Sequence, residues 1–155
     1  MYEKFFSKWI SWDRRNELKS LNYPGIYIVA HSKRKLTGAK FSWVKEIIYI
    51  GMTNAVGGLK GRLYQFDQAI GGKRLTHGGA DRVRFKHQKY KPFVSHAYVA
   101  VASFKCDVSS LKPSDLKEMG EVAKFEYLCF SEHATKYKCL PEFNRKISPK
   151  YSKKI

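Results

Sequence analysis

Two short stretches decide the fold, GIYIVAH at residues 25–31 and EIIYIGM at residues 46–52. Both are rich in β-branched and aromatic side chains, which fit the pleated surface of a strand. We therefore predict strands over 25–31 and 46–52, and a third strand over 95–104, where the sequence SHAYVAVASF alternates. The first stretch opens with the tripeptide Gly25-Ile26-Tyr27, and the second contains the tripeptide Tyr49-Ile50-Gly51.

Helical spacing of apolar residues predicts three helices around these strands. The first covers residues 2–21, and Pro24 ends it because proline disfavours helix in the residue before it. The second covers 59–70, with one apolar face and with Gly71-Gly72 at its end. The third begins at Ser114-Asp115, where acidic residues suit the positive end of the helix dipole, and runs to about Tyr137.

The resulting order is helix, strand, strand, helix, strand, helix, which is typical of an α+β domain with antiparallel strands. We predict a single domain over residues 1–155, with a small three-stranded antiparallel sheet flanked by helices and a helical arm at 1–23. The basic stretch 32–45 is either a long surface loop or a hairpin extension. Residues 73–92 form a second polar, basic segment, and we expect the basic tail 146–155 to be mobile.

The charge balance indicates the partner. Thirty Lys and Arg residues face thirteen Asp and Glu residues, which gives a formal net charge of +17 over 155 residues. Such a surface favours nucleic acid or an anionic membrane surface, although a charge that serves solubility alone is the alternative. No apolar run is long enough to span a bilayer. Three cysteines without a CxxC pair make a disulfide framework or a zinc site a poor interpretation, and we expect a cytoplasmic protein.

The two tripeptides, with the residues that follow them, resemble the GIY-YIG nucleases. The further matches are Leu59-Lys60-Gly61-Arg62-Leu63, a later helix that carries glutamates, and Pro141-Glu142-Phe143-Asn144. The resemblance runs from about Gly25 to Asn144. It implies the same small antiparallel sheet with helices around it, and the hydrolysis of phosphodiester bonds. Two departures stand out. The 21 residues between Tyr27 and Tyr49 exceed the usual family spacing, and Phe66 stands where the family often has a histidine.

The resemblance also implies roles for single residues. Tyr27 would receive a proton from the attacking water, and Tyr49 would hold that water or the phosphate. Tyrosine is a weak base at neutral pH unless a metal or an arginine lowers its pKa. Arg62 would bind the scissile phosphate, because a guanidinium stays charged and contacts two oxygens at once. His77, in THGGA, is the candidate replacement for the missing histidine and would pass a proton or bind the phosphate.

Glu126 is the best match to the metal-binding glutamate of the family, and Glu121 and Glu132 are the alternatives. A carboxylate among apolar neighbours needs a partner, and a hydrated Mg²⁺, with Mn²⁺ as a substitute, would supply one. Asn144 would orient the glutamate or the phosphate.

We therefore expect a divalent-metal-dependent DNA endonuclease, either a type II restriction enzyme or a phage or mobile-element nuclease. It would act on double-stranded DNA, as a homodimer if it cuts both strands. The alternative is a non-catalytic nucleic-acid-binding module with a degenerate nuclease fold. Aromatic residues such as Phe41 and Trp43 lie among the basic residues and would stack on bases. The expected DNA contacts are Lys33, Arg34, Lys35, Lys40, Lys73, Arg74, Arg82 and Arg84.

Overall fold

A computed structural model describes residues 2–73 and 77–145 of the chain. It is an α+β structure with a four-stranded antiparallel sheet in the order β1-β4-β2-β3. The expected strands are confirmed as β2 (Gly25–His31), β3 (Ile47–Thr53) and β4 (Ala97–Ser103). The prediction of three strands is wrong, because β1 (Ile10–Ser11) pairs with Val99 and Tyr98 of β4 and adds a fourth. Two residues are too short a strand to leave a sequence pattern.

The central strand β2 is buried on both faces. Tyr27 and Val29 belong to the core on one face, and Ile26, Ile28 and Ala30 belong to the core on the other. All five side chains are fully buried. A strand covered on both sides reads as a continuous apolar run, which is why this stretch stands out in the sequence.

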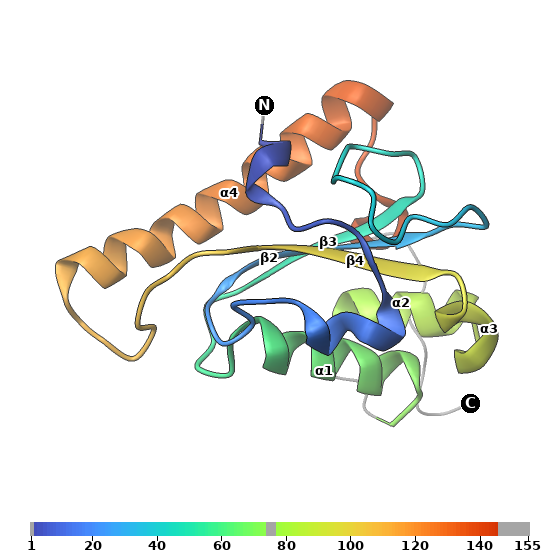
Figure 1. Cartoon of the computed structure of the whole chain (residues 1–155), viewed down its shortest axis with the longest axis horizontal. Coiled ribbons are helices and arrows are strands. Elements are labelled where there is room, and N and C mark those ends of the chain that lie inside the picture. Colours follow the sequence, from blue (N-terminus) through green and yellow to red (C-terminus); the bar gives the residue numbers. More distant parts are fainter. Residues whose placement is uncertain (1, 74–76, 146–155) are drawn as a thin grey trace.

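Helices cover both faces of the sheet (Figure 1). On one side lie α1 (Gly58–Ile70) and α2 (Gly78–Lys86), and on the other lies the long helix α4 (Pro113–Tyr137). The predicted boundaries of α1 and α4 are confirmed, with Gly72 at a positive φ of 77° just after α1. The basic segment 73–92 was not expected to be helical, yet it holds α2 and most of the short α3 (Tyr90–Val94). Few apolar residues mark α2, so its periodicity is weak.

The predicted helix over 2–21, and with it the helical arm at 1–23, is wrong. This segment forms a 3₁₀ helix at Glu3–Phe5, then β1, and then a 3₁₀ helix at Trp12–Glu17. The physical reason lies in two tryptophans. Trp9 is buried in the core beneath α4, whereas Trp12 is buried in the core beneath α1. A helix places residues three apart on one face, so only an extended crossing delivers the two rings to opposite faces of the sheet.

Asp67 of α1 fastens this N-terminal segment to the sheet's helices. Its Oδ1 accepts hydrogen bonds from Trp12 Nε1 at 2.8 Å and from the Tyr90 hydroxyl at 2.7 Å. Its Oδ2 lies 3.4 Å from Arg15 Nη2. Burial, with the Asp67 hydrogen bond, raises the pKa of Tyr90 to about 12. One carboxylate therefore joins the N-terminal segment to α1 and α3.

Within the described residues, no helix has the length and apolar character needed to cross a membrane. The predicted tail at 146–155 and Arg74 lie outside the described residues.

The Asp67 contacts generate a stability prediction. The substitution Asp67→Asn keeps one acceptor but removes the charge opposite Arg15, and it should lower the free energy of unfolding by about 1–3 kcal/mol. Glu17→Gln is the matched control, because the Arg14–Glu17 pair is exposed to solvent and should contribute little to stability. Urea unfolding of the three proteins measures both effects. Equal losses for the two variants would contradict the structural role of Asp67.

Candidate active site

The two tripeptides contact each other through Tyr27 and Gly51. Tyr27 pairs with Gly51 across β2 and β3, so each tripeptide supplies one partner of this contact. A Cβ atom on Gly51 would overlap the Tyr27 ring and lie 2.5 Å from its hydroxyl oxygen. Gly79 of α2 serves the second tyrosine in the same way, because a Cβ there would overlap the Tyr49 ring. Both tyrosines thus occupy space that any other residue at 51 or 79 would fill.

His77 fixes the hydroxyl of Tyr27. The N-terminus of α2 is capped by His77, whose Nδ1 accepts the backbone N–H of Ala80 at 3.1 Å. The ring proton is therefore on Nε2, which lies 2.6 Å from the Tyr27 hydroxyl and donates to it. Burial and the nearby charge of Arg62 lower the pKa of His77 to about 3. The ring is consequently neutral at physiological pH.

Tyr27 and Tyr49 form a coupled pair. Their rings lie 5.9 Å apart, and both pack against Phe66, which occupies the place where a histidine was expected. Burial raises the pKa of Tyr27 well above its usual value, and the charge of Tyr49 raises it further. Burial also raises the pKa of Tyr49, but Arg62 and the hydrogen bond with Tyr27 oppose that shift. Tyr27 is 0% exposed, whereas Tyr49 is partly exposed.

Arg62 is the electrostatic centre of the site. Its charge acts on the titration of Tyr27, Tyr49, His77 and Glu126. It projects from α1, where Nη1 donates to Gln65 at 3.1 Å and Nε is buried without a hydrogen-bond partner. The site therefore holds a half-buried guanidinium with unused donor capacity, which suits an anionic ligand.

Among the three candidate glutamates, only Glu126 joins this cluster. Burial raises the pKa of the half-buried Glu126, while Arg62 opposes the shift. Glu126 in turn raises the pKa of Tyr49. Glu132 lies six residues further along α4. Burial raises the pKa of Cys129, and the charges of Glu126 and Glu132 both raise it further. Glu121 is exposed and lines a groove with Phe5 and Phe104.

A divalent cation fits the Glu126 carboxylate if the ion keeps most of its own waters. No group of three or more His, Cys, Asp or Glu side chains that would hold a metal occurs among the described residues. An all-protein cage for Zn²⁺ or Ca²⁺ is therefore a poor fit there. Mg²⁺ keeps most of its waters and takes only one or two carboxylates together with substrate phosphates. The desolvated Glu126 carboxylate meets that requirement.

Asn144 supports the strand that carries Tyr49. It lies in the 3₁₀ helix Glu142–Asn144, beside β3, the strand at one edge of the sheet. Its Oδ1 accepts the backbone N–H of Ile50 at 2.8 Å, and its Nδ2 donates to the Ile50 carbonyl at 2.8 Å. The amide is thus used on the backbone of the second tripeptide rather than on Glu126.

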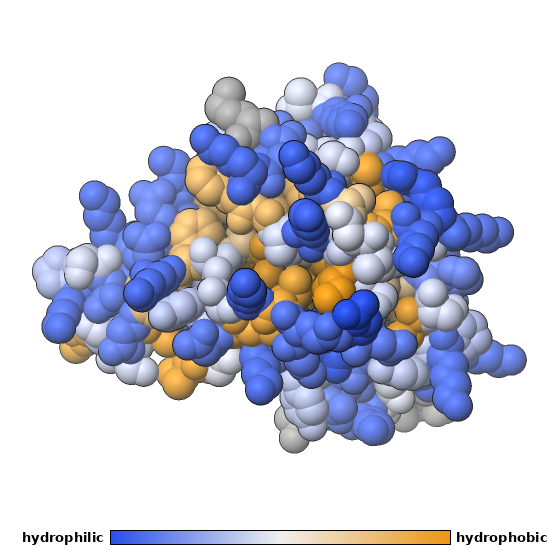
Figure 2. Space-filling model, in the orientation of Figure 1, coloured by the Kyte–Doolittle hydropathy of each residue, from blue (hydrophilic) through white to orange (hydrophobic). Residues whose placement is uncertain are grey.

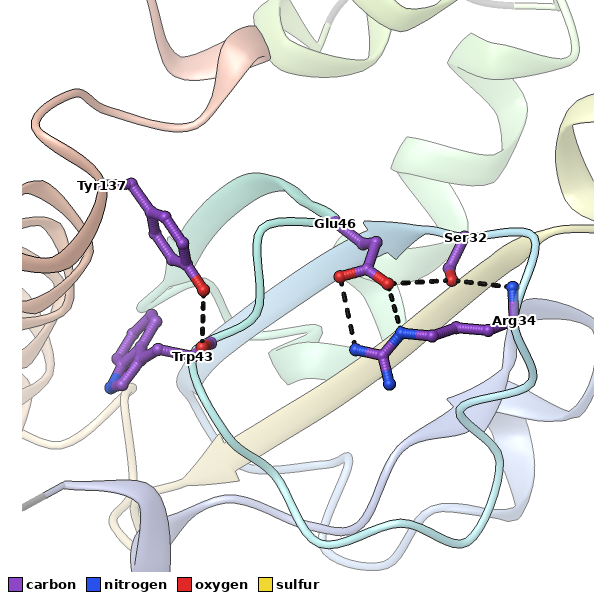
Figure 3. A network of polar contacts seen from close by, with 5 residues as sticks. All are labelled: Ser32, Arg34, Trp43, Glu46 and Tyr137. Carbon is purple, nitrogen blue, oxygen red and sulfur yellow. Dashed lines mark hydrogen bonds and ion pairs between the residues drawn. The ribbon is translucent and has the colours of Figure 1, made fainter.

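The stretch 32–45 is a long loop rather than an extended hairpin, and polar contacts hold both of its ends in place (Figure 3). Arg34 forms an ion pair with Glu46, and Ser32 donates to the same carboxylate at 3.3 Å. The Tyr137 hydroxyl donates to the Trp43 carbonyl at 2.8 Å and ties the loop to α4. The expectation that Phe41 and Trp43 stack on bases is wrong, because both are core residues with 6% and 4% exposure.

The remaining basic residues divide into two groups. Lys33, Lys35, Lys40 and Lys73 are exposed. Arg84 is half-buried, and its Nη1 donates to the Ile70 carbonyl at 3.3 Å, at the end of α1. Arg82 reaches the Phe143 carbonyl at 3.5 Å, and its charge lowers the pKa of Tyr49. Arg82 therefore belongs with the tyrosine cluster.

The molecule also has a large hollow away from this cluster. A cavity of about 750 Å³ lies against the N-terminal segment and β4, and its lining includes Phe5, Trp9 and Val101. None of the tyrosine-cluster residues lines it. Hydrophilic side chains cover most of the face shown in Figure 2, around an apolar area near its centre.

Comparison with known proteins identifies no relative of this chain. No protein-family model, no curated protein and no solved structure matches the chain. The interpretation of the site therefore rests on its own residues.

Sequence reasoning missed Gly79 and Ala80 as parts of the site. The sequence did indicate the start of a helix at this point, because His77 is followed at once by Gly78-Gly79 and a helix-compatible run. A capping side chain before a helix accepts a backbone N–H two or three residues later. Histidine is an uncommon residue for that position, so the pattern did not suggest a cap.

The tyrosine–glycine contact predicts a steric effect on stability. Gly51→Ala places a methyl group inside the Tyr27 ring and should cost about 1–3 kcal/mol of unfolding free energy. Gly120→Ala is the matched control, because a Cβ there has no neighbour within 4 Å and alanine favours helix, so α4 should gain up to about 1 kcal/mol. Urea unfolding distinguishes the two. A Gly51→Ala protein as stable as the wild type would refute the contact.

The buried His77 predicts a pH dependence of stability. Its folded pKa of about 3 lies below the unfolded value, so the unfolded chain binds the proton first and stability falls as pH drops below about 6.5. Between pH 7.5 and pH 5 this one group should remove roughly 2 kcal/mol. His77→Asn keeps a capping side chain but does not titrate, and should lose about 2 kcal/mol less over that range. Parallel urea curves for both proteins at the two pH values provide the test; identical pH dependence would contradict it.

Proposed function

We propose that this chain is a divalent-metal-dependent DNA endonuclease with a fold of the GIY-YIG type. The observation that carries the proposal is the convergence of Tyr49, Arg62 and Glu126, which come from β3, α1 and α4. A proton-bearing hydroxyl, a fixed cation and a desolvated carboxylate are the groups that phosphodiester hydrolysis requires.

Arg62 supplies the fixed charge. Its guanidinium cannot lose its proton, and α1 holds it next to both tyrosines before any substrate arrives. A phosphate oxygen that gains charge in the transition state would meet a donor already in place, so little reorganisation is needed. Arg82 adds a second positive charge near Tyr49.

Glu126 is the group that would hold the metal. When bound, Mg²⁺ supplies Lewis acidity toward a phosphate oxygen and a more acidic bound water. The protein keeps the Glu126 carboxylate half-buried, so that its charge would attract a cation more strongly than it would in bulk water.

The substrate proposed is double-stranded DNA. Lys33, Lys35 and Lys40 stand exposed on the anchored loop 32–45, and they would contact phosphates without reading bases. Arg34 is already paired with Glu46, so its role is to hold the loop in place. A restriction enzyme and a phage or mobile-element nuclease both fit this arrangement, with a homodimer for cutting two strands.

One observation favours a non-catalytic nucleic-acid-binding module as the second candidate. Tyr27, the expected proton acceptor, is fully buried and has a strongly raised pKa. A protein that has kept the fold and the charge but lost catalysis would also bind DNA. Nicking of supercoiled plasmid with Mg²⁺ and with EDTA separates the two functions.

The metal role of Glu126 gives the sharpest test of cleavage. Glu126→Gln preserves shape but removes the charge, so Mg²⁺-dependent nicking should fall by roughly 10²-fold or more while DNA affinity remains. Glu132→Gln is the matched control on the same helix and should cut like the wild type. Single-turnover nicking and Mn²⁺ binding of the two variants are measured side by side. An inactive Glu132→Gln with an active Glu126→Gln would reverse the assignment, and a wild type without nicking would leave only the binding module.

A further inference from the structure

The cavity of about 750 Å³ beside the N-terminal segment lies apart from the tyrosine cluster and has a size typical of ligand pockets. Residues from the segment 5–20, from the loop at Thr37 and Gly38, and from β4 at Val101 and Ser103 line it, and we call it the N-terminal hollow. It lies on the β1 side of the sheet, whereas Tyr49 lies on β3 at the other edge. The N-terminal segment crosses in front of β4 in Figure 1, and Figure 2 shows apolar side chains at the centre of this face with hydrophilic ones around them.

One exposed aromatic ring borders the N-terminal hollow. Trp9 and Phe6 line its inner part, because Trp9 is 2% exposed and Phe6 is half-buried. Phe5 also lines it but is 55% exposed. The Phe5 ring meets the buried Phe125 ring edge-on, with centroids 5.9 Å apart, so its own face is held toward the surroundings. A flat aromatic face in this position can stack on a planar ligand.

Positive charge surrounds the N-terminal hollow. Lys8, Arg14 and Lys19 line it and are exposed, and Glu17 is the one acidic residue among the described residues that line it. Arg14 is already paired with Glu17 at 2.7 Å. No ion pair within the described part of the chain involves Lys8 or Lys19. The hollow therefore keeps two lysine charges for an anionic ligand.

A neighbouring groove shows that this charge is a property of the N-terminal hollow and not of every hollow in the molecule. The groove has a volume of about 510 Å³ and shares Phe5 and Ser103 with the hollow. Its charged lining residues balance one another, because they are Lys105, Lys124, Glu118 and Glu121. An anionic ligand should therefore prefer the N-terminal hollow, and the groove serves as a comparison within the same protein.

Hydroxyl groups complete the lining of the N-terminal hollow. Ser20, Thr37 and Ser103 come from three separate parts of the chain. Ser20 has a φ of 61°, in the left-handed region where glycine is the least strained residue. The chain thus carries a hydroxyl at a position where glycine would cost less. A hydroxyl both donates and accepts hydrogen bonds, so it can bind the edge of a base or a sugar oxygen.

We propose that the N-terminal hollow binds one unpaired nucleotide of a single-stranded nucleic acid. Phe5 stacks on the base, and Lys8 and Lys19 contact the flanking phosphates. The bases of an intact duplex are stacked and paired, and taking one out costs free energy, so the hollow selects unpaired strands. This inference goes beyond the proposed nuclease function, which concerns double-stranded DNA and a different part of the sheet, and it requires no cleavage.

The lining favours a nucleotide over an anionic membrane surface. A membrane-binding face presents several apolar side chains that insert between lipids, with cations around them. Among the described lining residues, Phe5 is the one large apolar side chain that is exposed. One ring is enough to stack on a base but inserts little apolar surface into a bilayer.

Stacking on Phe5 is tested by the binding of a short fluorescein-labelled oligothymidine, followed by fluorescence anisotropy in EDTA. Phe5→Ala should weaken binding by roughly 5- to 150-fold, and Phe5→Tyr should restore it because an aromatic face returns. Tyr127→Ala is the matched control, since Tyr127 is 73% exposed but does not line the hollow. A blunt duplex should bind all four proteins alike. Unchanged oligothymidine affinity of Phe5→Ala, or an equal loss for the duplex, would overturn the proposal.

The charge contribution is tested with two double variants that lower the net charge equally. Lys8→Ala with Lys19→Ala removes the two lysines of the N-terminal hollow, and Lys105→Ala with Lys124→Ala removes those of the neighbouring groove. Each phosphate contact on a single strand adds about 0.7 to the log–log salt slope, so the first pair should make the slope shallower by about 1.4 and the second should leave it unchanged. Equal changes would show diffuse attraction instead of a site.

Vesicles that contain phosphatidylserine provide the test of the competing occupant. Wild type and Phe5→Ala should bind them equally. Vesicle binding that depends on Phe5, together with oligothymidine binding that does not, would assign the hollow to a membrane. All of these measurements are made without a divalent metal, so a wild type that fails to nick plasmid refutes the nuclease function and leaves the nucleotide site standing. An active nuclease whose oligothymidine binding ignores Phe5 refutes only the site.

Discussion

The site depends on one close contact, the Tyr27 ring lying over Gly51 on the neighbouring strand. The contact requires β2 and β3 to pair in this register, because a shift of one residue would turn Tyr27 to the opposite face. It also brings the Tyr27 hydroxyl to His77, whose capping of α2 sets the start of that helix. The strands, the helix and the tyrosine pair are therefore fixed together, and none of them can move without disturbing the others.

The sequence predicts the three main strands, α1 and α4 because their apolar patterns are long and regular. It does not predict β1, since two residues carry no period and their pairing with β4 is set by Trp9 and Trp12 on opposite faces. Of the site residues, Arg62 and Glu126 interact electrostatically, because burial raises the pKa of Glu126 and the charge of Arg62 opposes that shift. The use of Asn144 on the Ile50 backbone follows from its place beside an edge strand, which only the tertiary structure reveals.

Basic residues in this chain serve two separate purposes. Arg15, Arg34 and Arg84 are held by a carboxylate or a carbonyl and fasten one segment to another. The lysines at 33, 35 and 40 remain exposed on a loop whose larger apolar side chains, Leu36, Phe41 and Trp43, are buried. Arginine suits the first purpose because its planar fork holds fixed geometries, and lysine suits the second because its charge stays hydrated and mobile. The number of positively charged residues therefore overstates how many of them are available to contact DNA.

The crossing of the N-terminal segment between the two cores has a consequence for how the chain folds. Trp9 and Trp12 need β4, α1 and neighbouring core residues as partners, and β1 pairs with residues about ninety positions later. Contacts so distant in sequence form slowly, because the intervening chain must be ordered first. During synthesis this segment therefore emerges before β4 and waits without its partners, leaving Trp9 and Trp12 in water. A segment that is made before its partners is thus among the last to be secured, and this interval is when the chain is most open to aggregation.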